Sequence, residues 1–243
     1  MSTFQFAIIY GFFITRSFAR YNQIEELIAS EDAYWLSVYR TAQLWGKGLV
    51  DKLRELIDRY YIISYDYELG YYYKQTAPIL DEVYQVMTQE FKPTGDRLDD
   101  TYAEFLVFLA TIEDLRNRLS VRAQQRMTLG HWALLYVLGG IIVFSLFALK
   151  TPQLHSQVIT VLLSTMVVLL FLVLRDLNSL RLGSAYLATE SGQEVLEAIG
   201  KLRYYSKMYS QDKTARIPKT VKKYRQGLHN AGEPLDIKVV ERT

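Results

Sequence analysis

The pattern of apolar and polar positions divides the chain into uncharged apolar runs and regions with helical periodicity. Two runs lack any charge: WALLYVLGGIIVFSLFAL, residues 132–149, and VITVLLSTMVVLLFLVL, residues 158–174. As a helix, each run would rise roughly 26 Å, close to the ~30 Å hydrocarbon core of a bilayer. Lys150 and Pro152 lie between the runs, and a proline disfavours one continuous helix. The pattern predicts a transmembrane helical hairpin over residues 132–174.

A third apolar stretch, FQFAIIYGFFI, covers residues 4–14 near the N-terminus. It is short for a membrane span, and it lacks the basic region and cleavage site of a signal peptide. We interpret residues 1–18 as a short N-terminal membrane segment, either a short span or an interfacial anchor, and the sequence leaves both open.

Residues 19–131 have the periodicity of a helical region. A first helix carries apolar residues at Ile24, Leu27, Ile28, Trp35, Val38, Ala42 and Trp45. Gly46 and Gly48 interrupt this pattern, and a second helix follows over residues 49–61. After a tyrosine-rich loop, Pro78 suits the first turn of another helix. A long helix then starts near Asp99, and no helix breaker separates it from the first apolar run. This pattern predicts one continuous rod into the membrane.

Glu31 interrupts the apolar stripe of the first helix, where an aliphatic residue is expected. A lone buried charge is costly, so a basic partner should accompany it. We predict that Glu31 is a buried charge paired with an arginine of the helix over residues 99–127.

Residues 175–243 contain a short helix followed by a basic tail. Ser191 and Glu194 have the spacing of a capping box for a helix that ends near Gly200. Between Gln211 and Arg225 the tail has one acid, Asp212, among basic residues, and it is predicted to be disordered and to bind anionic lipid weakly. Its basic residues are Lys213, Arg216, Lys219, Lys222, Lys223 and Arg225. Almost no strand pattern occurs anywhere, so the predicted fold class is all-α.

The distribution of Lys and Arg predicts the orientation of the hairpin. Basic residues precede the first apolar run and follow the second, whereas the connection between the runs contains only Lys150. By the positive-inside rule, the central helical region and the C-terminus should be cytoplasmic and Pro152 external.

Three arginines just before the first run, Arg118, Arg122 and Arg126, recur every fourth residue and should form one stripe on a helix. They are candidates for an anion-attracting vestibule at the mouth of a pore. The alternative is an ordinary positive flank whose side chains reach lipid phosphate. Arg175 and Asp176 directly follow the second run, and we interpret them as a charge pair at the membrane boundary.

Composition excludes several function classes. The 243-residue chain has a net charge of only +2, so no nucleic-acid partner is indicated. It has no cysteine, and its three histidines have no metal-ligand spacing. Nucleotide-binding and nucleophile motifs are missing, so we expect no enzyme activity, catalytic residue, metal or cofactor. Seven tyrosines occur in YYIISYDYELGYYY, residues 60–73, and they indicate helix packing, a recognition surface or an aromatic belt at the level of the lipid headgroups.

The chain resembles the bestrophin-like family of membrane proteins. The stretches that carry the likeness are residues 14–42, residues 115–140, the hairpin, LVLRDLNSLRLG at 172–183 and ESGQEVLEAIG at 190–200. Individual matching positions are Glu31, Tyr39, Arg40, Arg118, Leu119, Trp132, Asp176 and Leu177. The resemblance implies distant kinship with bestrophins, which are pentameric anion channels, and a bacterial inner (plasma) membrane location.

The sequence therefore predicts an all-α integral membrane protein with a transmembrane helical hairpin and a cytoplasmic helical bundle. The leading hypothesis is a homo-oligomer in the lipid bilayer that conducts small anions. The rival is a non-conducting membrane-anchored scaffold or signalling module that acts through its cytoplasmic helices.

Overall fold

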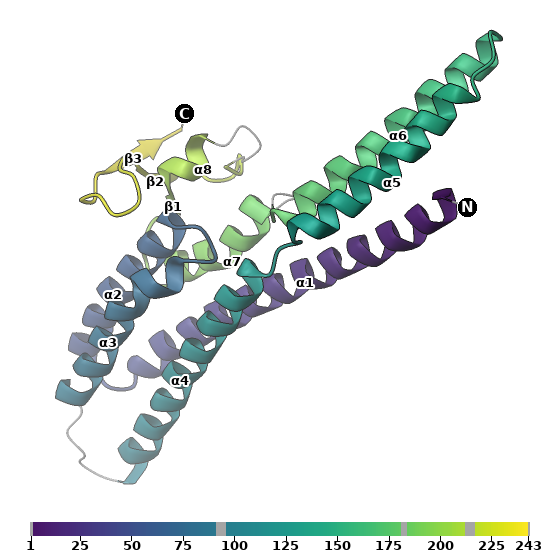
Figure 1. The fold of residues 1–243 in the computed structure, drawn as a ribbon. Helices are drawn as coiled ribbons and strands as arrows, with labels where there is room; N and C mark the ends of the chain where they lie inside the picture. The colour runs from purple at the N-terminus through teal and green to yellow at the C-terminus, as the bar shows by residue number, and fades with distance from the viewer. Residues whose placement is uncertain (1, 91–95, 181–183, 212–216, 243) are drawn as a thin grey trace. The chain divides into compact units, whose positions relative to one another are not determined.

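The computed structural model describes residues 2–90, 96–180, 184–211 and 217–242 (Figure 1). The described residues are mostly helical, with a few short strands. The long helices are α1 (Ser2–Ala42), α2 (Lys47–Asp66), α3 (Tyr72–Glu90), α4 (Asp96–Gln124), α5 (Leu129–Ala148), α6 (Leu154–Asn178) and α7 (Ser184–Ala198). The C-terminal elements are β1 (Tyr204–Tyr205), α8 (Lys207–Gln211), β2 (Lys223–Gly227) and β3 (Ile237–Glu241). The chain forms two compact units: unit 1 is Met1–Gln23 with Gln125–Gly183, and unit 2 is Ile24–Gln124 with Ser184–Thr243.

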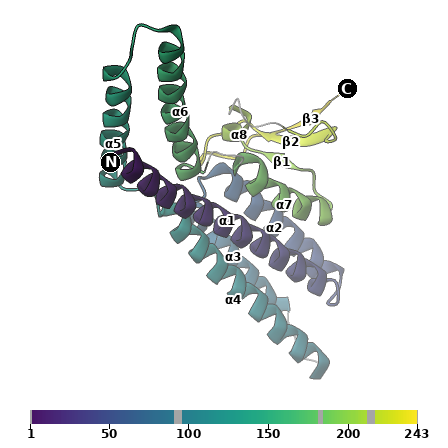
Figure 2. The same cartoon turned by 90° about the vertical axis from the view of Figure 1, so that its right-hand side faces the viewer.

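In unit 1, α5 and α6 run side by side as a helical hairpin (Figures 1 and 2). The connection, residues 149–153, contains the predicted breaker Pro152. The two helices approach closely at Gly139, where an added Cβ would lie 2.6 Å from the ring of Phe171. Two apolar helices therefore occur where the sequence predicted a hairpin.

The N-terminal half of α1 packs on this hairpin. Tyr10 donates a hydrogen bond to the carbonyl of Leu170 at 2.9 Å. The buried cluster of unit 1 consists of Phe6, Tyr10, Phe13, Leu135, Ile142 and Leu174. The apolar stretch at residues 4–14 and the helix predicted from residue 21 are parts of one helix of 41 residues.

The prediction of one rod from the long helix into the first apolar run is wrong. Helix α4 ends at Gln124, residues 125–128 are not helical, and α5 starts at Leu129. Side chains satisfy the backbone amides that the break frees. The Met127 amide donates to Oδ1 of Asn178 at 2.8 Å, and the Thr128 amide donates to Nδ1 of His131 at 3.3 Å. These partners replace the helical hydrogen bonds, so the break needs no proline or glycine.

Unit 2 has a hydrophobic core built from α1, α2, α3, α4 and α7. Its fully buried members include Trp35, Val38, Leu53, Ile57, Val83, Phe105, Leu109, Ile112, Val195 and Leu196. Helix α2 starts after Gly46, whose φ of 112° suits glycine, in agreement with the predicted interruption. Pro78, however, lies inside α3 rather than in its first turn. It removes one backbone donor from the helix, so the Lys74 carbonyl loses its helical partner.

Two predictions about the C-terminal region are also wrong. Ser191 lies inside α7, which begins at Ser184, so it does not cap the helix. The tail is not disordered over its described part, because β2 pairs in parallel with β1 and antiparallel with β3. The buried side chains of Val221 and Tyr224 account for this, since they give the basic segment an apolar face that packs with Tyr205 and Tyr209. Lys213 and Arg216 lie outside the described residues.

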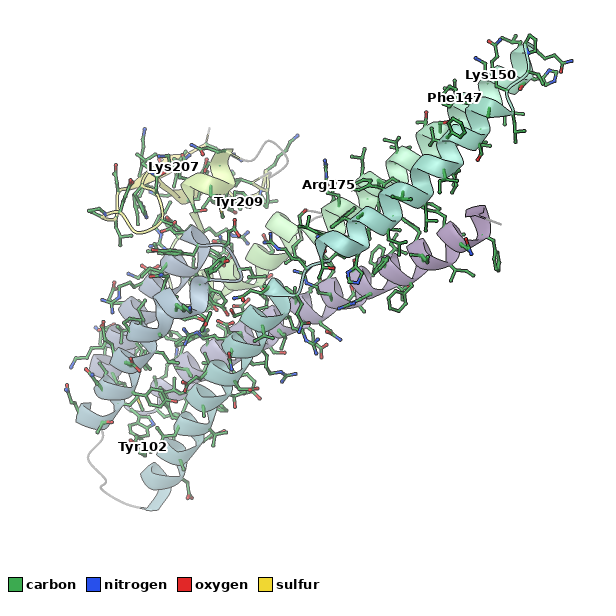
Figure 3. All side chains as sticks on the ribbon, viewed as in Figure 1. Tyr102, Phe147, Lys150, Arg175, Lys207 and Tyr209 are labelled. Atoms are coloured by element: carbon green, nitrogen blue, oxygen red, sulfur yellow. The ribbon has the colours of Figure 1, made fainter. Side chains whose placement is uncertain are left out.

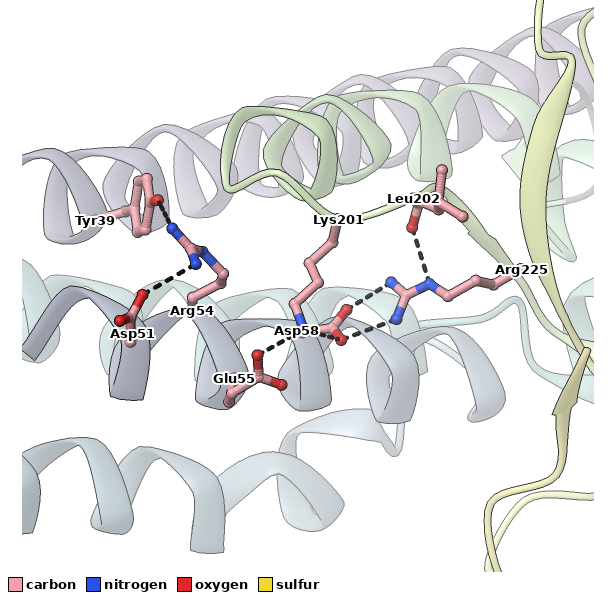
Figure 4. A network of polar contacts seen from close by, with 8 residues as sticks. All are labelled: Tyr39, Asp51, Arg54, Glu55, Asp58, Lys201, Leu202 and Arg225. Atoms are coloured by element: carbon pink, nitrogen blue, oxygen red, sulfur yellow. Dashed lines mark hydrogen bonds and ion pairs between the residues drawn. The ribbon is translucent and has the colours of Figure 1, made fainter. Parts of the chain in front are cut away.

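An ion-pair network holds β2 to α2 (Figure 4). The guanidinium of Arg225 makes two hydrogen bonds to the Asp58 carboxylate, at 2.5 and 2.8 Å, and a third to the Leu202 carbonyl at 3.0 Å. Lys201 bridges Glu55 at 2.7 Å and Asp58 at 3.5 Å. The Asp58 side chain is largely buried, so the bidentate pair compensates for its lost hydration.

A second buried contact involves Asp66 near the C-terminal end of α2. One carboxylate oxygen accepts a hydrogen bond from Tyr204 at 2.7 Å, and the other lies 2.9 Å from Nε2 of His229. Burial opposes a charge on His229, but hydrogen bonds to the Asp236 carbonyl and to Asp66 outweigh it and raise the His229 pKa. The strands therefore attach to α2 through two carboxylates, Asp58 and Asp66.

Replacing Arg225 with alanine should loosen the strands from α2, because Lys201 would be the remaining partner of Asp58 among the residues that the structure describes. We expect the opening free energy of this region to fall by about 1–3 kcal/mol. Hydrogen exchange of the amides in residues 223–241 measures this loss. Lys238→Ala, an exposed change on β3, is the matched control. Equal protection in the two variants would contradict the structural role of the pair.

Candidate functional site

Unit 1 exposes most of its apolar surface. In the described residues, two stretches contain helices long and apolar enough to cross a membrane, Asp100–Ala148 and Leu154–Asn178, and only 17% of each apolar window is buried. Figure 3 shows the side chains of α5 and α6, with Lys150 at the tip of the hairpin and Arg175 toward its other end. Exposed apolar side chains on these helices include Val137, Phe144, Phe147, Val158, Leu162, Met166 and Leu169. A core helix of a soluble protein would bury this face, so the surface needs lipid or protein to cover it.

Helix α1 carries a second exposed apolar row in unit 1. Phe4, Ile8 and Phe12 are spaced four residues apart and are 72%, 56% and 62% exposed. Phe6 and Phe13, by contrast, are buried against the hairpin. This part of α1 is therefore apolar on two faces, although only one of them packs against other described residues.

Charged and polar groups gather where α6 ends. Arg175 and Asp176 form an ion pair at 3.1 Å in the last turns of α6, with the Arg175 side chain well exposed. Arg20 of α1 is buried and donates to the carbonyl of Asn178, the last residue of α6, at 2.9 Å. A cation at this position also interacts favourably with the helix dipole.

The three arginines of the predicted stripe do not share one helix. Arg118 and Arg122 are exposed on α4, and Arg118 lies 3.5 Å from Asp114, one turn earlier. Arg126 is exposed in the non-helical segment between α4 and α5. Its side-chain direction is therefore not set by the period of α4.

Glu31 lies on α1 in unit 2 and is 5% exposed. Its two carboxylate oxygens accept hydrogen bonds from Tyr60 of α2 and from Tyr72 of α3, the latter at 2.6 Å. Burial raises the Glu31 pKa, while the two hydroxyls and the charge of Arg116 oppose the rise. Arg116, on α4, directly contacts the Tyr73 carbonyl and Thr76 and lies over the ring of Tyr60.

Asp32, the next residue, is 6% exposed and forms a separate site. One of its oxygens accepts a hydrogen bond from Tyr61 of α2 at 2.5 Å. Burial raises the Asp32 pKa to about 7, although the Ser191 and Tyr61 hydroxyls favour the ionised form. Adjacent residues of one helix thus place two buried carboxylates against different tyrosines of unit 2.

The sequence did not identify the groups that contact these carboxylates. It predicted an arginine partner for Glu31, whereas the direct donors are tyrosine hydroxyls and Arg116 acts through its charge. Asp32 was not singled out at all. The seven tyrosines of residues 60–73 were the available signal, because Tyr60, Tyr61 and Tyr72 supply the donors. Within the described residues, no group of three His, Asp or Glu side chains could hold a metal ion.

The comparison with protein families matches the Bestrophin-like domain over residues 2–181. The match covers most of the chain, so this chain belongs to the bestrophin-like family. It includes the hairpin, α1 and both buried carboxylates, and it ends before α7. The comparisons with curated proteins and with solved structures find no match.

Glu31→Ala should destabilise unit 2, because it removes the acceptor of two buried tyrosine hydroxyls and leaves Arg116 without its opposing charge. We expect a loss of about 1–3 kcal/mol in the free energy of unfolding. Thermal unfolding of the detergent-solubilised protein tests this. Glu25→Ala, an exposed change on the same helix, should change stability by no more than about 0.5 kcal/mol. Identical melting temperatures for the two variants would refute the assigned role of Glu31.

Proposed function

We propose that the chain is an oligomeric integral membrane protein that conducts small anions, with its hairpin in the bilayer and unit 2 in the cytoplasm. The observation that carries the proposal is the apolar surface of unit 1. Helices α5 and α6 present uncharged, mostly exposed faces long enough to span the hydrocarbon core. Membership of the bestrophin-like family supports the same placement.

The exposed apolar row of α1 supports self-association of the chain. Phe4, Ile8 and Phe12 project from the face that does not pack on the hairpin. In an oligomer, copies of this row would face one another or line a shared path, and hydrophobic constrictions of this kind gate some channels. The proposal involves no catalytic chemistry.

The basic residues before α5 support selectivity for anions over cations. Arg118 and Arg122 lie in the last turns of α4, and Arg126 lies in the short segment before α5. Repeated around a ring, these exposed cations would raise the local concentration of anions. Asp114 lies 3.5 Å from Arg118 and partly offsets its charge.

The proposed topology predicts which sites a membrane-impermeant thiol reagent can reach in intact cells. The natural chain has no cysteine, so single substitutions give clean signals. Gln153→Cys, in the hairpin connection, should react from outside, whereas Asn230→Cys should react only after permeabilisation. Both residues are exposed. Labelling of Asn230→Cys in intact cells would overturn the cytoplasmic placement of unit 2.

Replacing Arg118, Arg122 and Arg126 with glutamine should reduce anion selectivity in planar bilayers, and more at low salt than at high salt. The reason is screening, since the Debye length falls from roughly 10 Å at 0.1 M to roughly 3 Å at 1 M. The matched control replaces three exposed cations elsewhere, Arg40, Lys47 and Lys219, and should leave selectivity unchanged.

The same experiment separates the rival function. If well-folded wild-type oligomer carries no current and the arginine variant alters only membrane insertion, the arginines serve as a positive-inside flank. The chain would then act as a non-conducting membrane-anchored scaffold through unit 2.

A further inference from the structure

Asp32 differs from Glu31 in how its carboxylate is satisfied. Both oxygens of Glu31 accept tyrosine hydrogen bonds. At Asp32, Oδ1 accepts from Tyr61, but Oδ2 is enclosed and, within the described part of the chain, receives no hydrogen bond of normal geometry. An ionised carboxylate in an enclosed site normally needs donors to both oxygens, whereas a protonated one has less charge to solvate.

The charged groups around Asp32 also disfavour its ionised form. Glu31 on α1 and Glu194 on α7 are both acidic and raise its pKa. Arg116 of α4 acts on Glu31 and on its two tyrosines instead. The titratable groups that α2 turns toward Asp32 are Tyr61 and Tyr65, whose pKa values burial raises well above 10.

A cation that contacts α7, Arg203, is already paired with acids of that helix. Arg203, which precedes β1, forms ion pairs at 2.7 Å with Glu190 and Glu197 of α7. Besides Glu194, α7 places a neutral group near Asp32, the hydroxyl of Ser191.

Helix α7 packs tightly against the tyrosines that surround Asp32. A Cβ added at Gly192 would lie 2.2 Å from the hydroxyl of Tyr65 and 2.7 Å from the ring of Tyr61. The backbone of α7 therefore lies directly against these rings, and Gln193 is fully buried beside it. A change in charge at Asp32 would act on the α1–α2–α7 contact, which has little space to adjust.

We propose that Asp32 is a proton-binding site, and that its protonation near neutral pH tightens the packing of α7 against α1 and α2. The direction of the pH effect follows from the linkage between proton binding and folding. A carboxyl whose folded pKa is raised gives stability that is complete below its ordinary pKa and is lost as pH rises through the folded value. With an ordinary value of about 4 and a folded value of about 7, the loss begins near pH 4 and is complete by about pH 8, and its last tenfold falls between pH 6 and pH 8. The proposal does not depend on whether the protein conducts.

Hydrogen exchange of the α7 amides in the full-length protein, in detergent at pH 6 and pH 8, tests the site once intrinsic exchange rates are corrected for. Wild type should lose about tenfold in protection between these pH values, the factor that linkage gives for one such group. Asp32→Asn, an isostere of the protonated form, should keep the higher protection at both. A tenfold loss that persists in Asp32→Asn would overturn the proposal.

Two variants test other titrating groups. Glu31→Gln should retain the pH dependence of α7 protection. If Glu31→Gln lost this pH dependence and Asp32→Asn kept it, the proton would be assigned to Glu31. His229→Gln should alter protection in residues 223–241 and leave the response of α7 intact.

If Asp32→Asn fails to fold, infrared spectroscopy of Glu31→Gln gives a second readout. A protonated carboxyl band that disappears with a midpoint near pH 7 supports the site, and no such band at pH 6 refutes it.

Discussion

The stability of unit 2 depends on how the protein compensates two adjacent buried carboxylates, Glu31 and Asp32, for their lost hydration. An ionised carboxylate in a low-dielectric interior costs several kcal/mol unless donors or an opposite charge compensate for it. Glu31 obtains this compensation from Tyr60, Tyr72 and the charge of Arg116. Asp32 accepts one hydrogen bond from Tyr61, and the acidic side chains of Glu31 and Glu194 act on it. The positions of α2, α3 and α4 around α1 are therefore linked to the chemistry of these two residues.

Unit 1 is built under the opposite constraint. Its helices expose apolar faces, and in the bilayer that we propose for them backbone polar groups would have to be satisfied internally wherever a helix stops. The interruption between α4 and α5 shows how this is done, because Asn178 and His131 accept from the amides of Met127 and Thr128. Arg20 then donates to the carbonyl of Asn178, so one residue at the end of α6 is hydrogen-bonded to two other segments.

The sequence was informative where a single local signal decided the structure. Uncharged runs of 17 and 18 residues identified the hairpin helices, and the polar interruption of an apolar stripe singled out Glu31. Prediction from the sequence failed where side chains distant in sequence determine the local structure. The break before α5 depends on Asn178, about fifty residues away, and the donors to Glu31 come from α2 and α3. The strands were missed because basic residues outnumber the apolar ones, Val221 and Tyr224, that pack them.

The environment of Asp32 extends beyond the region that matches the family. That match ends at residue 181, whereas Ser191, Gly192 and Glu194 belong to α7. Burial is the largest cause of the raised Asp32 pKa, and α7 contributes to that burial by packing on Tyr61 and Tyr65. The residue that titrates thus lies inside the family domain, while part of what sets its pKa lies outside it. A chain that shared only the matched region would solvate Asp32 more fully and hold its pKa closer to the ordinary value for aspartate.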